Sequence, residues 1–263
     1  MKDGAHAGDP AAILCAARQS GAALAAFPGP VPDTLEDAYA CQRRLLAGLG
    51  SPVRGWKVGR IPPAMTGVLA AERLAGPVLR CAMLSGEAPG EAAVFVGGAA
   101  AIEVEVMLRL AGVPDRVLRD DAEARGYVDA VCAGFEVASS PAPDVHDHAP
   151  FGIISDNGIN NGILIGPSLS ADDFDHVPVE TRIGGTLVGQ GRAVDILDGP
   201  LGALRFLVDL HLRGMIVLAP GQWISAGAIT GVHPFAPGEV ATARFGADLA
   251  ISCVAVPETG YSS

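Results

Sequence analysis

Residues 101–110 read Ala-Ile-Glu-Val-Glu-Val-Met-Leu-Arg-Leu, and their strict alternation predicts a β-strand. Apolar residues fill the even-numbered positions and therefore share one face of the strand. Glu103 and Glu105 share the other face, roughly 6.5 to 7 Å apart. Two carboxylates this close repel each other unless a cation lies between them. Because paired glutamates are also found on solvated strand faces, this stretch leaves a cation site and a solvated face both open.

Composition predicts one main folded domain. The chain has 263 residues, of which 49% are hydrophobic and 18% charged, so it is long and apolar enough for a sizeable core. Its 34 glycines and 20 prolines indicate many turns, as in a β-rich fold.

The charge of the chain argues against two classes of partner. The net charge is −11, and Lys and Arg form no cluster, so neither nucleic acid nor an anionic membrane is expected to bind. An anionic substrate would therefore need a metal ion or an isolated Lys or Arg in its pocket.

The cysteines and the amino terminus predict a cytoplasmic protein. Five cysteines are widely spaced, and no CxxC pair is present, so neither a disulfide framework nor a zinc knuckle is indicated. The first residues lack a basic region followed by an apolar run, and no stretch has the apolar length of a membrane span.

Capping residues predict three helices. Asp9 and Pro10 begin a helix that we expect to run to about residue 25, and Thr34 caps a second one. These two helices suggest an N-terminal cap. Asp120 begins a further helix, with acidic residues in its first turn, that is expected to run to about residue 133.

Lys57 lies in a short apolar strand between Gly55 and Gly59. Two interpretations are open. In the first, the side chain extends its ammonium into water. In the second, the ammonium is partly desolvated, with a lowered pKa suited to proton transfer or to anion binding.

A third carboxylate occurs in another apolar strand, residues 134–139, where Glu136 is the one acid. The polar turn Asp156-Asn157-Gly158 is a weaker signal, since such turns are common. His146 and His148 lie in a proline-rich segment, residues 141–150, that predicts a solvated loop rather than a metal site.

Taken together, six short motifs resemble those of the 2-keto-4-pentenoate hydratase and 4-oxalocrotonate decarboxylase family, within the fumarylacetoacetate hydrolase superfamily. The resemblance covers residues 35–256. The motifs, in chain order, are Gly55-Trp-Lys-Val-Gly59, Glu103-Val-Glu105, Phe135-Glu-Val137, Ser155-Asp-Asn157, Gly199-Pro-Leu-Gly-Ala203 and Ala226-Gly-Ala-Ile-Thr-Gly231.

The resemblance implies an α+β fold, a mixed β-roll with an N-terminal helical cap. Residues 1–50 would form the cap and residues 51–263 the catalytic domain. It also implies a homo-oligomer and a role in aromatic catabolism.

The resemblance further implies a site. Mg²⁺ or Mn²⁺ would be held by Glu103, Glu105 and Glu136, an oxygen-only ligand set that suits these hard cations. Lys57 and Asp156 would be catalytic, with Asp156 orienting polar groups at the rim of the pocket. The substrate would contact Lys57, Val58, Asn157 and Gly227.

The implied activity is that of a lyase, a metal-dependent hydratase that adds water to a short 2-hydroxydienoate or 2-oxo-alkenoate acid. Decarboxylation of a 4-oxalocrotonate-type acid uses the same electron sink and is the first alternative. A carbon–carbon hydrolase acting on an acylpyruvate is the second; it needs a Glu and a His, and no histidine falls at an obvious position. A keto-acid binder without turnover is the third.

The chain departs from the family pattern near the expected pocket. Ala82 stands where the hydratases usually carry an Asp, and Ala226 replaces a Ser or Thr. Ser139-Ser140-Pro141 follows the Glu136 strand where the family often has a Ser-Arg pair. Asp198-Gly199-Pro200 replaces Gly-His-Pro. These changes spare the expected metal ligands and leave the reaction itself open.

Overall fold

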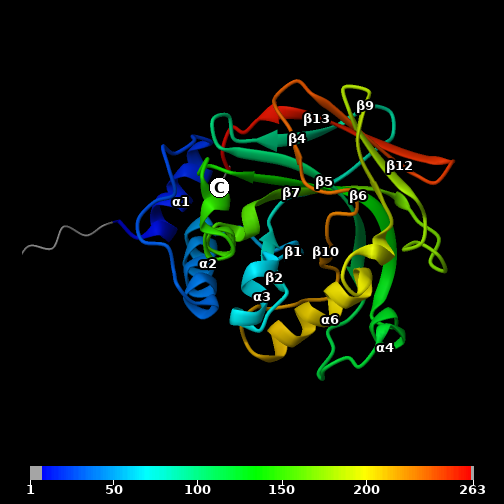
Figure 1. The fold of residues 1–263 in the computed structure, drawn as a ribbon, viewed down its shortest axis with the longest axis horizontal. Coiled ribbons are helices and arrows are strands. Elements are labelled where there is room, and N and C mark those ends of the chain that lie inside the picture. Colours follow the sequence, from blue (N-terminus) through cyan, green and yellow to red (C-terminus); the bar gives the residue numbers. More distant parts are fainter. Residues whose placement is uncertain (1–7, 262–263) are drawn as a thin grey trace, which may run out of the picture.

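A computed structural model describes residues 8–261 of the chain. In these residues the strands form two sheets (Figure 1). The larger has the order β2-β1-β10-β5-β6-β7-β3, with β11 paired to β5, and the smaller has the order β4-β13-β12-β8-β9. Helices accompany sheets in which neighbouring strands are both parallel and antiparallel, so the fold is α+β, as the sequence predicted. Residues 8–261 form no closed barrel.

The strands of the larger sheet are β1 (Gly55–Arg60), β2 (Arg73–Val78), β3 (Cys81–Met83), β5 (Ala99–Leu110), β6 (Val128–Ser140), β7 (Asn160–Ser168), β10 (Trp223–Ser225) and β11 (His233–Pro234). Those of the smaller sheet are β4 (Gly90–Val94), β8 (Val179–Ile183), β9 (Thr186–Gly191), β12 (Val240–Phe245) and β13 (Leu249–Pro257). The α-helices are α1 (Pro10–Ser20), α2 (Leu35–Leu49), α3 (Pro63–Leu69), α4 (Asp121–Arg125), α5 (Phe151–Ser155) and α6 (Gly199–Leu212). Three short 3₁₀ helices are η1 (Val145–His148), η2 (Asn157–Ile159) and η3 (Ala193–Asp195).

The predicted strand is the long central strand β5. Its even-numbered apolar residues are almost fully buried, and they belong to the main apolar core together with Leu204 and Leu207 of α6. The opposite face of β5 is not solvated, because Glu103 and Glu105 are only 6% and 0% exposed. Of the two interpretations left open by the sequence, the solvated face is therefore wrong.

Two predicted helices end earlier than expected. The first ends at Ser20, because Gly21 adopts a left-handed conformation (φ 72°) that closes the helix. The helix that begins after Asp120 spans only Asp121–Arg125, and the following residues form β6. Valines at 128 and 131 favour a strand, and pairing with β5 along most of its length outweighs the local helix signal.

The amino-terminal helices pack against the body of the fold on the side where the chain also ends (Figure 1). Arg18 of α1 is fully buried, and its Nε donates a hydrogen bond of 2.6 Å to Asp156 Oδ1. Its other nitrogens donate to the carbonyl oxygens of Ser139 and Asn160. A buried guanidinium thus joins α1 to β6 and β7.

We expect Arg18→Met to destabilise the fold by about 3 to 5 kcal/mol, because it leaves the buried Asp156 carboxylate without its cation. Chemical denaturation measures this change. The matched control is Arg44→Met, which removes an exposed ion pair to Asp9 and should cost about 1 kcal/mol or less. Equal effects of the two substitutions would contradict a dominant role for the buried pair.

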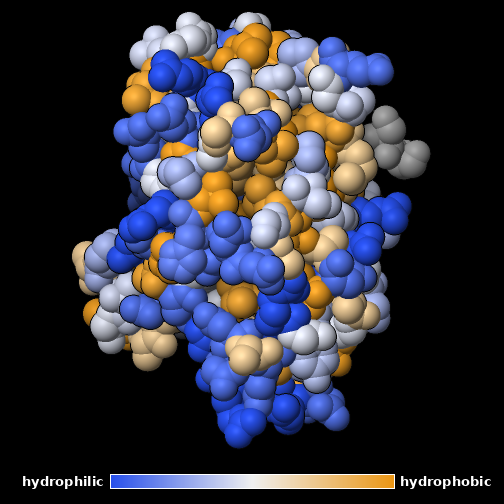
Figure 2. Space-filling view, turned by 90° about the vertical axis from the view of Figure 1, so that its right-hand side faces the viewer, coloured by the Kyte–Doolittle hydropathy of each residue, from blue (hydrophilic) through white to orange (hydrophobic). Residues whose placement is uncertain are grey.

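The surface is uneven on the side that carries β9 and β12. Apolar residues gather in the upper part of this face, and polar residues dominate below (Figure 2). Exposed apolar side chains on these two strands are Leu187, Val188 and Val240. The homo-oligomer expected from the sequence stays a prediction. No helix in residues 8–261 has both the length and the apolar character needed to cross a membrane.

Candidate metal centre

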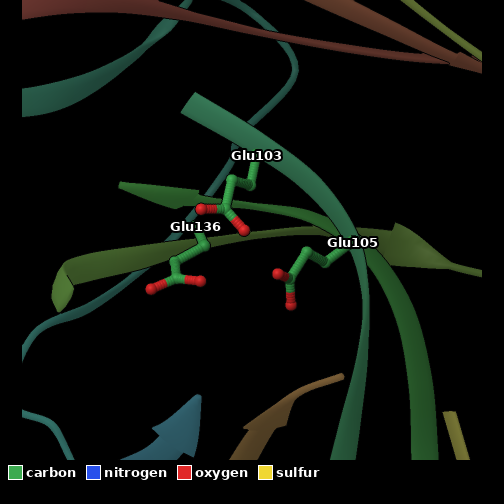
Figure 3. Close-up of side chains that lie close together, drawn as sticks. All are labelled: Glu103, Glu105 and Glu136. Atoms are coloured by element: carbon green, nitrogen blue, oxygen red, sulfur yellow. The ribbon is translucent and has the colours of Figure 1, made fainter. Parts of the chain in front are cut away.

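The register of β5 and β6 brings the three glutamates together. Glu103 lies directly opposite Glu136 across this antiparallel pair, and Glu105 is two residues further along the same face. Their carboxylates point into one common space (Figure 3), and one oxygen from each lies within 4.8 Å of the others. The three side chains are buried, so the arrangement can hold a single small cation.

Two of the carboxylates are oriented by hydrogen bonds. Ser225 Oγ and the backbone N–H of Gly227 both donate to Glu105 Oε2, the latter at 2.9 Å. The other oxygen, Oε1, accepts no hydrogen bond from the described residues. Asn160 Nδ2 donates to Glu136 Oε1 at 3.0 Å. Glu105 thus keeps one oxygen without a donor among the described residues, whereas the second oxygen of Glu136 faces Lys57.

Lys57 reaches this cluster from β1. Its Nζ lies 3.3 Å from Glu136 Oε2, and its backbone pairs with Ser225 of β10. A Cβ atom at Gly59 would lie only 3.4 Å from Nζ, so this glycine keeps the space beside the ammonium open. Lys57 is 4% exposed. The interpretation that Lys57 extends its ammonium into water is therefore wrong.

The charges in the cluster shift its pKa values. Burial, followed by repulsion from Glu136 and Glu103, raises the pKa of Glu105 well above its usual value. Burial and the Glu103 charge raise the pKa of Glu136 to about 7, although Lys57 and Asn160 act in the opposite direction. Burial alone would lower the pKa of Lys57, but Glu136, Glu103 and Glu105 outweigh it and raise that pKa. The lowered lysine pKa considered from the sequence is therefore wrong.

These shifts predict how a cation and pH act together. A carboxyl whose pKa is raised on folding makes the metal-free fold less stable as pH rises, here from about 4.5 to about 7. A bound cation removes this penalty and displaces the proton. We expect Mn²⁺ to raise the unfolding temperature more at pH 8 than at pH 6, with its affinity rising by up to about tenfold per pH unit below 7. Thermal unfolding and calorimetry at the two pH values measure this, and a pH-independent stabilisation would contradict it.

A cavity of about 450 Å³ opens above the cluster. Lys57, Val58 and Gly227, three of the predicted substrate-binding residues, line it, as does Glu103. Of the four departures from the family pattern, Ala226 also lines it. Ala82 lies instead on the exposed edge strand β3, and Ser140 is buried at the end of β6.

Asp156 and Asn157 lie elsewhere. The Asp156 carboxylate is fully buried in its ion pair with Arg18, not at the rim of the cavity. Its position favours a structural role over the catalytic one that the sequence suggested. Asn157 is also buried, with a left-handed backbone (φ 55°), and it does not line the cavity. Both polar atoms of its side chain lack partners among the described residues, so its substrate contact stays a prediction.

Sequence reasoning missed the arginines of the cavity and predicted only a solvated loop at His146. Arg60, Arg73, Arg192 and His146 line it together with Lys57. Arg73 pairs with Asp198, and Arg192 pairs with Asp195, whereas Arg60 has no ion-pair partner in residues 8–261. Although the chain carries a net charge of −11, this cavity is rich in positive side chains. Such a lining suits an anionic ligand.

The fold is that of solved enzymes that act on small organic acids. A 4-oxalocrotonate decarboxylase from Pseudomonas putida G7, complexed with magnesium and adipate, matches 94% of this chain and 96% of its own, with a TM-score of 0.75 and 20% identity. A fumarylpyruvate hydrolase from Pseudomonas aeruginosa, in complex with Mn²⁺ and pyruvate, matches 78% of this chain and 91% of its own, with a TM-score of 0.54 and 16% identity.

A 2-hydroxyhepta-2,4-diene-1,7-dioate isomerase from Mycobacterium marinum matches 78% of this chain and 76% of its own, with a TM-score of 0.54 and 16% identity. No protein-family model and no curated protein sequence matches the chain. The fold expected from the sequence resemblance is confirmed by these structural likenesses.

Proposed function

We propose that the chain belongs to the 2-keto-4-pentenoate hydratase and 4-oxalocrotonate decarboxylase family and is a divalent-metal-dependent enzyme. Its substrate would be a short 2-oxo or 2-hydroxydienoate acid. The observation that carries this proposal is the convergence of three buried carboxylates and one ammonium beneath a cavity with a cationic lining.

The residues fit a divalent cation. Three carboxylates and one ammonium leave a net charge of −2, which a divalent ion neutralises. All candidate ligand atoms are oxygens, and Glu105 Oε1 has no other partner, as suits Mg²⁺ or Mn²⁺. When bound there, the ion would supply a positive charge that stabilises the enolate oxygen of a 2-oxo acid. The decarboxylase and hydrolase of like fold carry Mg²⁺ and Mn²⁺.

Lys57 would hold the substrate carboxylate or donate a proton, because its ammonium stays charged and faces the space left by Gly59. The arginines would attract the acid, and the backbone at Gly227 would form one wall. Apolar side chains such as Ile153 and Ile229 complete the lining and would exclude water from the carbon chain.

We propose hydration as the reaction, with water added to the alkene of a 2-hydroxydienoate. Decarboxylation is the second candidate, favoured by the likeness in fold to the Pseudomonas putida decarboxylase along nearly the whole chain. Both reactions develop negative charge on the same oxygen of the substrate and need a proton delivered to its carbon chain.

An assay with three substrates separates the candidates. The protein with Mg²⁺ is incubated with 2-hydroxypenta-2,4-dienoate, 4-oxalocrotonate or acetylpyruvate, while ultraviolet absorbance and carbon dioxide are followed. Loss of the dienoate without gas supports hydration, and gas from 4-oxalocrotonate supports decarboxylation. Acetate and pyruvate from acetylpyruvate would indicate hydrolysis instead. If none of the three substrates changes, the result would contradict the proposed enzymatic activity and favour a protein that binds keto acids without turnover.

A further inference from the structure

A group that accepts a proton from the substrate carbon is still to be assigned. Lys57 lies close to three carboxylates, which favour its charged form, so it cannot readily accept a proton. Asp156 is held by Arg18 outside the cavity. Among the described residues that line the cavity, Glu103 belongs to the candidate metal centre and Asp195 pairs with Arg192 at 3.1 Å. His146 is the remaining proton acceptor of this lining.

The segment that carries His146 is firmly held. Val145, the residue before it, is fully buried in the apolar cluster beneath α1 and α2. Asp144 accepts a hydrogen bond of 2.6 Å from the backbone N–H of Phe27, and His148 Nε2 lies 3.4 Å from its other oxygen. The ring of His148 packs on that of Phe27, with centroids 5.2 Å apart. The short helix η1 is thus fixed on one side, while His146 lines the cavity on the other.

The surroundings of His146 favour its neutral form. The His146 side chain is exposed on the cavity surface. Desolvation by the surrounding protein atoms, and then the positive charge of Lys57, lower the pKa of its imidazole below the usual 6.5, with Asp147 acting in the opposite direction. The other charged groups that line the same cavity are Arg60, Arg73, Glu103, Arg192 and Asp195. A neutral imidazole at pH 7 can accept a proton and return it, which is the requirement for a general base.

We propose that His146 is a catalytic residue that transfers a proton at C3 of the bound 2-oxo acid. This inference rests on the proposed function. In the forward step the C3–H bond breaks and its electron pair forms the C2=C3 double bond. The carbonyl π pair moves onto the C2 oxygen, and the proton goes to the free imidazole nitrogen. In the reverse step the imidazolium gives a proton back to C3.

Hydrogen–deuterium exchange at C3 tests this step without knowledge of the natural substrate. Pyruvate and 2-oxobutyrate are incubated in D₂O with the Mg²⁺-loaded protein, and loss of the C3 proton signal is followed by NMR. We expect H146N to slow exchange by about 10² to 10⁴-fold. The control H176N changes an exposed histidine that does not line the cavity and should exchange as the wild type does. Added imidazole should partly restore exchange in H146A.

A second measurement does not depend on activity. In the metal-free protein, NMR titration of the His146 ring should give a pKa below 6.5, and Lys57→Met should raise it. Magnesium and oxalate affinities of H146N, measured by calorimetry, should match those of the wild type.

Exchange in H146N at the wild-type rate would overturn the proposal, as would equal slowing by H176N, which would show that the loss is not specific to His146. A wild-type protein that binds Mg²⁺ and oxalate but does not exchange C3 protons would also overturn it. A protein that binds neither would instead overturn the proposed function, and this inference with it.

Discussion

Glu105→Gln is expected to lower the affinity for Mn²⁺ or Mg²⁺ by more than about 100-fold. Substitution of a residue that only contacts a metal ligand usually lowers metal affinity by about 10 to 100-fold, and loss of a ligand should cost more. Ser225 Oγ and the Gly227 N–H donate to one oxygen of Glu105, so the amide oxygen of Gln should turn toward these donors. The NH₂ group then takes the place of Oε1. It has no lone pair to offer and faces two carboxylates, while the cluster loses one negative charge.

Isothermal titration calorimetry measures this loss. The control is Glu91→Gln, an exposed glutamate on β4, which should bind the ion as the wild type does. The metal-free Glu105→Gln protein should also be more stable than the metal-free wild type at pH 8, because one of three mutually repelling charges is gone. Unchanged affinity in a folded Glu105→Gln protein would remove this residue from the metal centre.

Lys57→Met is expected to lower turnover by about 10² to 10⁴-fold while the ion still binds. The substitution keeps an unbranched side chain, one atom shorter than that of Lys, but removes the charge that would hold or protonate the acid. The cluster would then carry three negative charges without compensation, so metal affinity should stay equal or rise. Steady-state kinetics with the substrate found by the three-substrate assay, together with calorimetry, separates the two effects.

Arg54→Met is the matched control, since Arg54 directly precedes β1 and its side chain is exposed. It should leave turnover unchanged. Lys57→Met with wild-type turnover would show that the buried ammonium serves only to offset the charge of Glu136.

The parts of the fold that the sequence predicts correctly follow from local patterns. Alternation identified β5 and placed Glu103 and Glu105 on one face, and Thr34 correctly marked the start of α2. Where tertiary pairing competed with a local signal, local reasoning failed. The helix expected after Asp120 gave way to β6, whose pairing with β5 is what places Glu136 opposite Glu103.

The environment of the site residues depended on contacts far apart in the chain. Lys57 was recognised as unusual, but its three acidic neighbours raise the lysine pKa where burial alone would lower it. The sequence predicts Asp156 at the rim of the pocket. Its actual partner, Arg18, lies 138 residues away in the chain, so no local pattern reveals the ion pair. The sequence predicts a solvated loop at His146. In the structure Val145 packs in an apolar cluster, and His146 beside it lines the cavity. The division of the chain at residue 50, the cytoplasmic location and the oligomer stay predictions.

The most direct measurement is a crystal structure of the protein grown with Mn²⁺ and oxalate, a planar mimic of the enolate, with anomalous scattering to locate the ion. We expect one anomalous peak per chain, bound by Glu103, Glu105 and Glu136, with oxalate beside it and within reach of Lys57. Crystals in which no peak lies between the three glutamates, or in which Mn²⁺ binds only elsewhere on the chain, would contradict the metal centre.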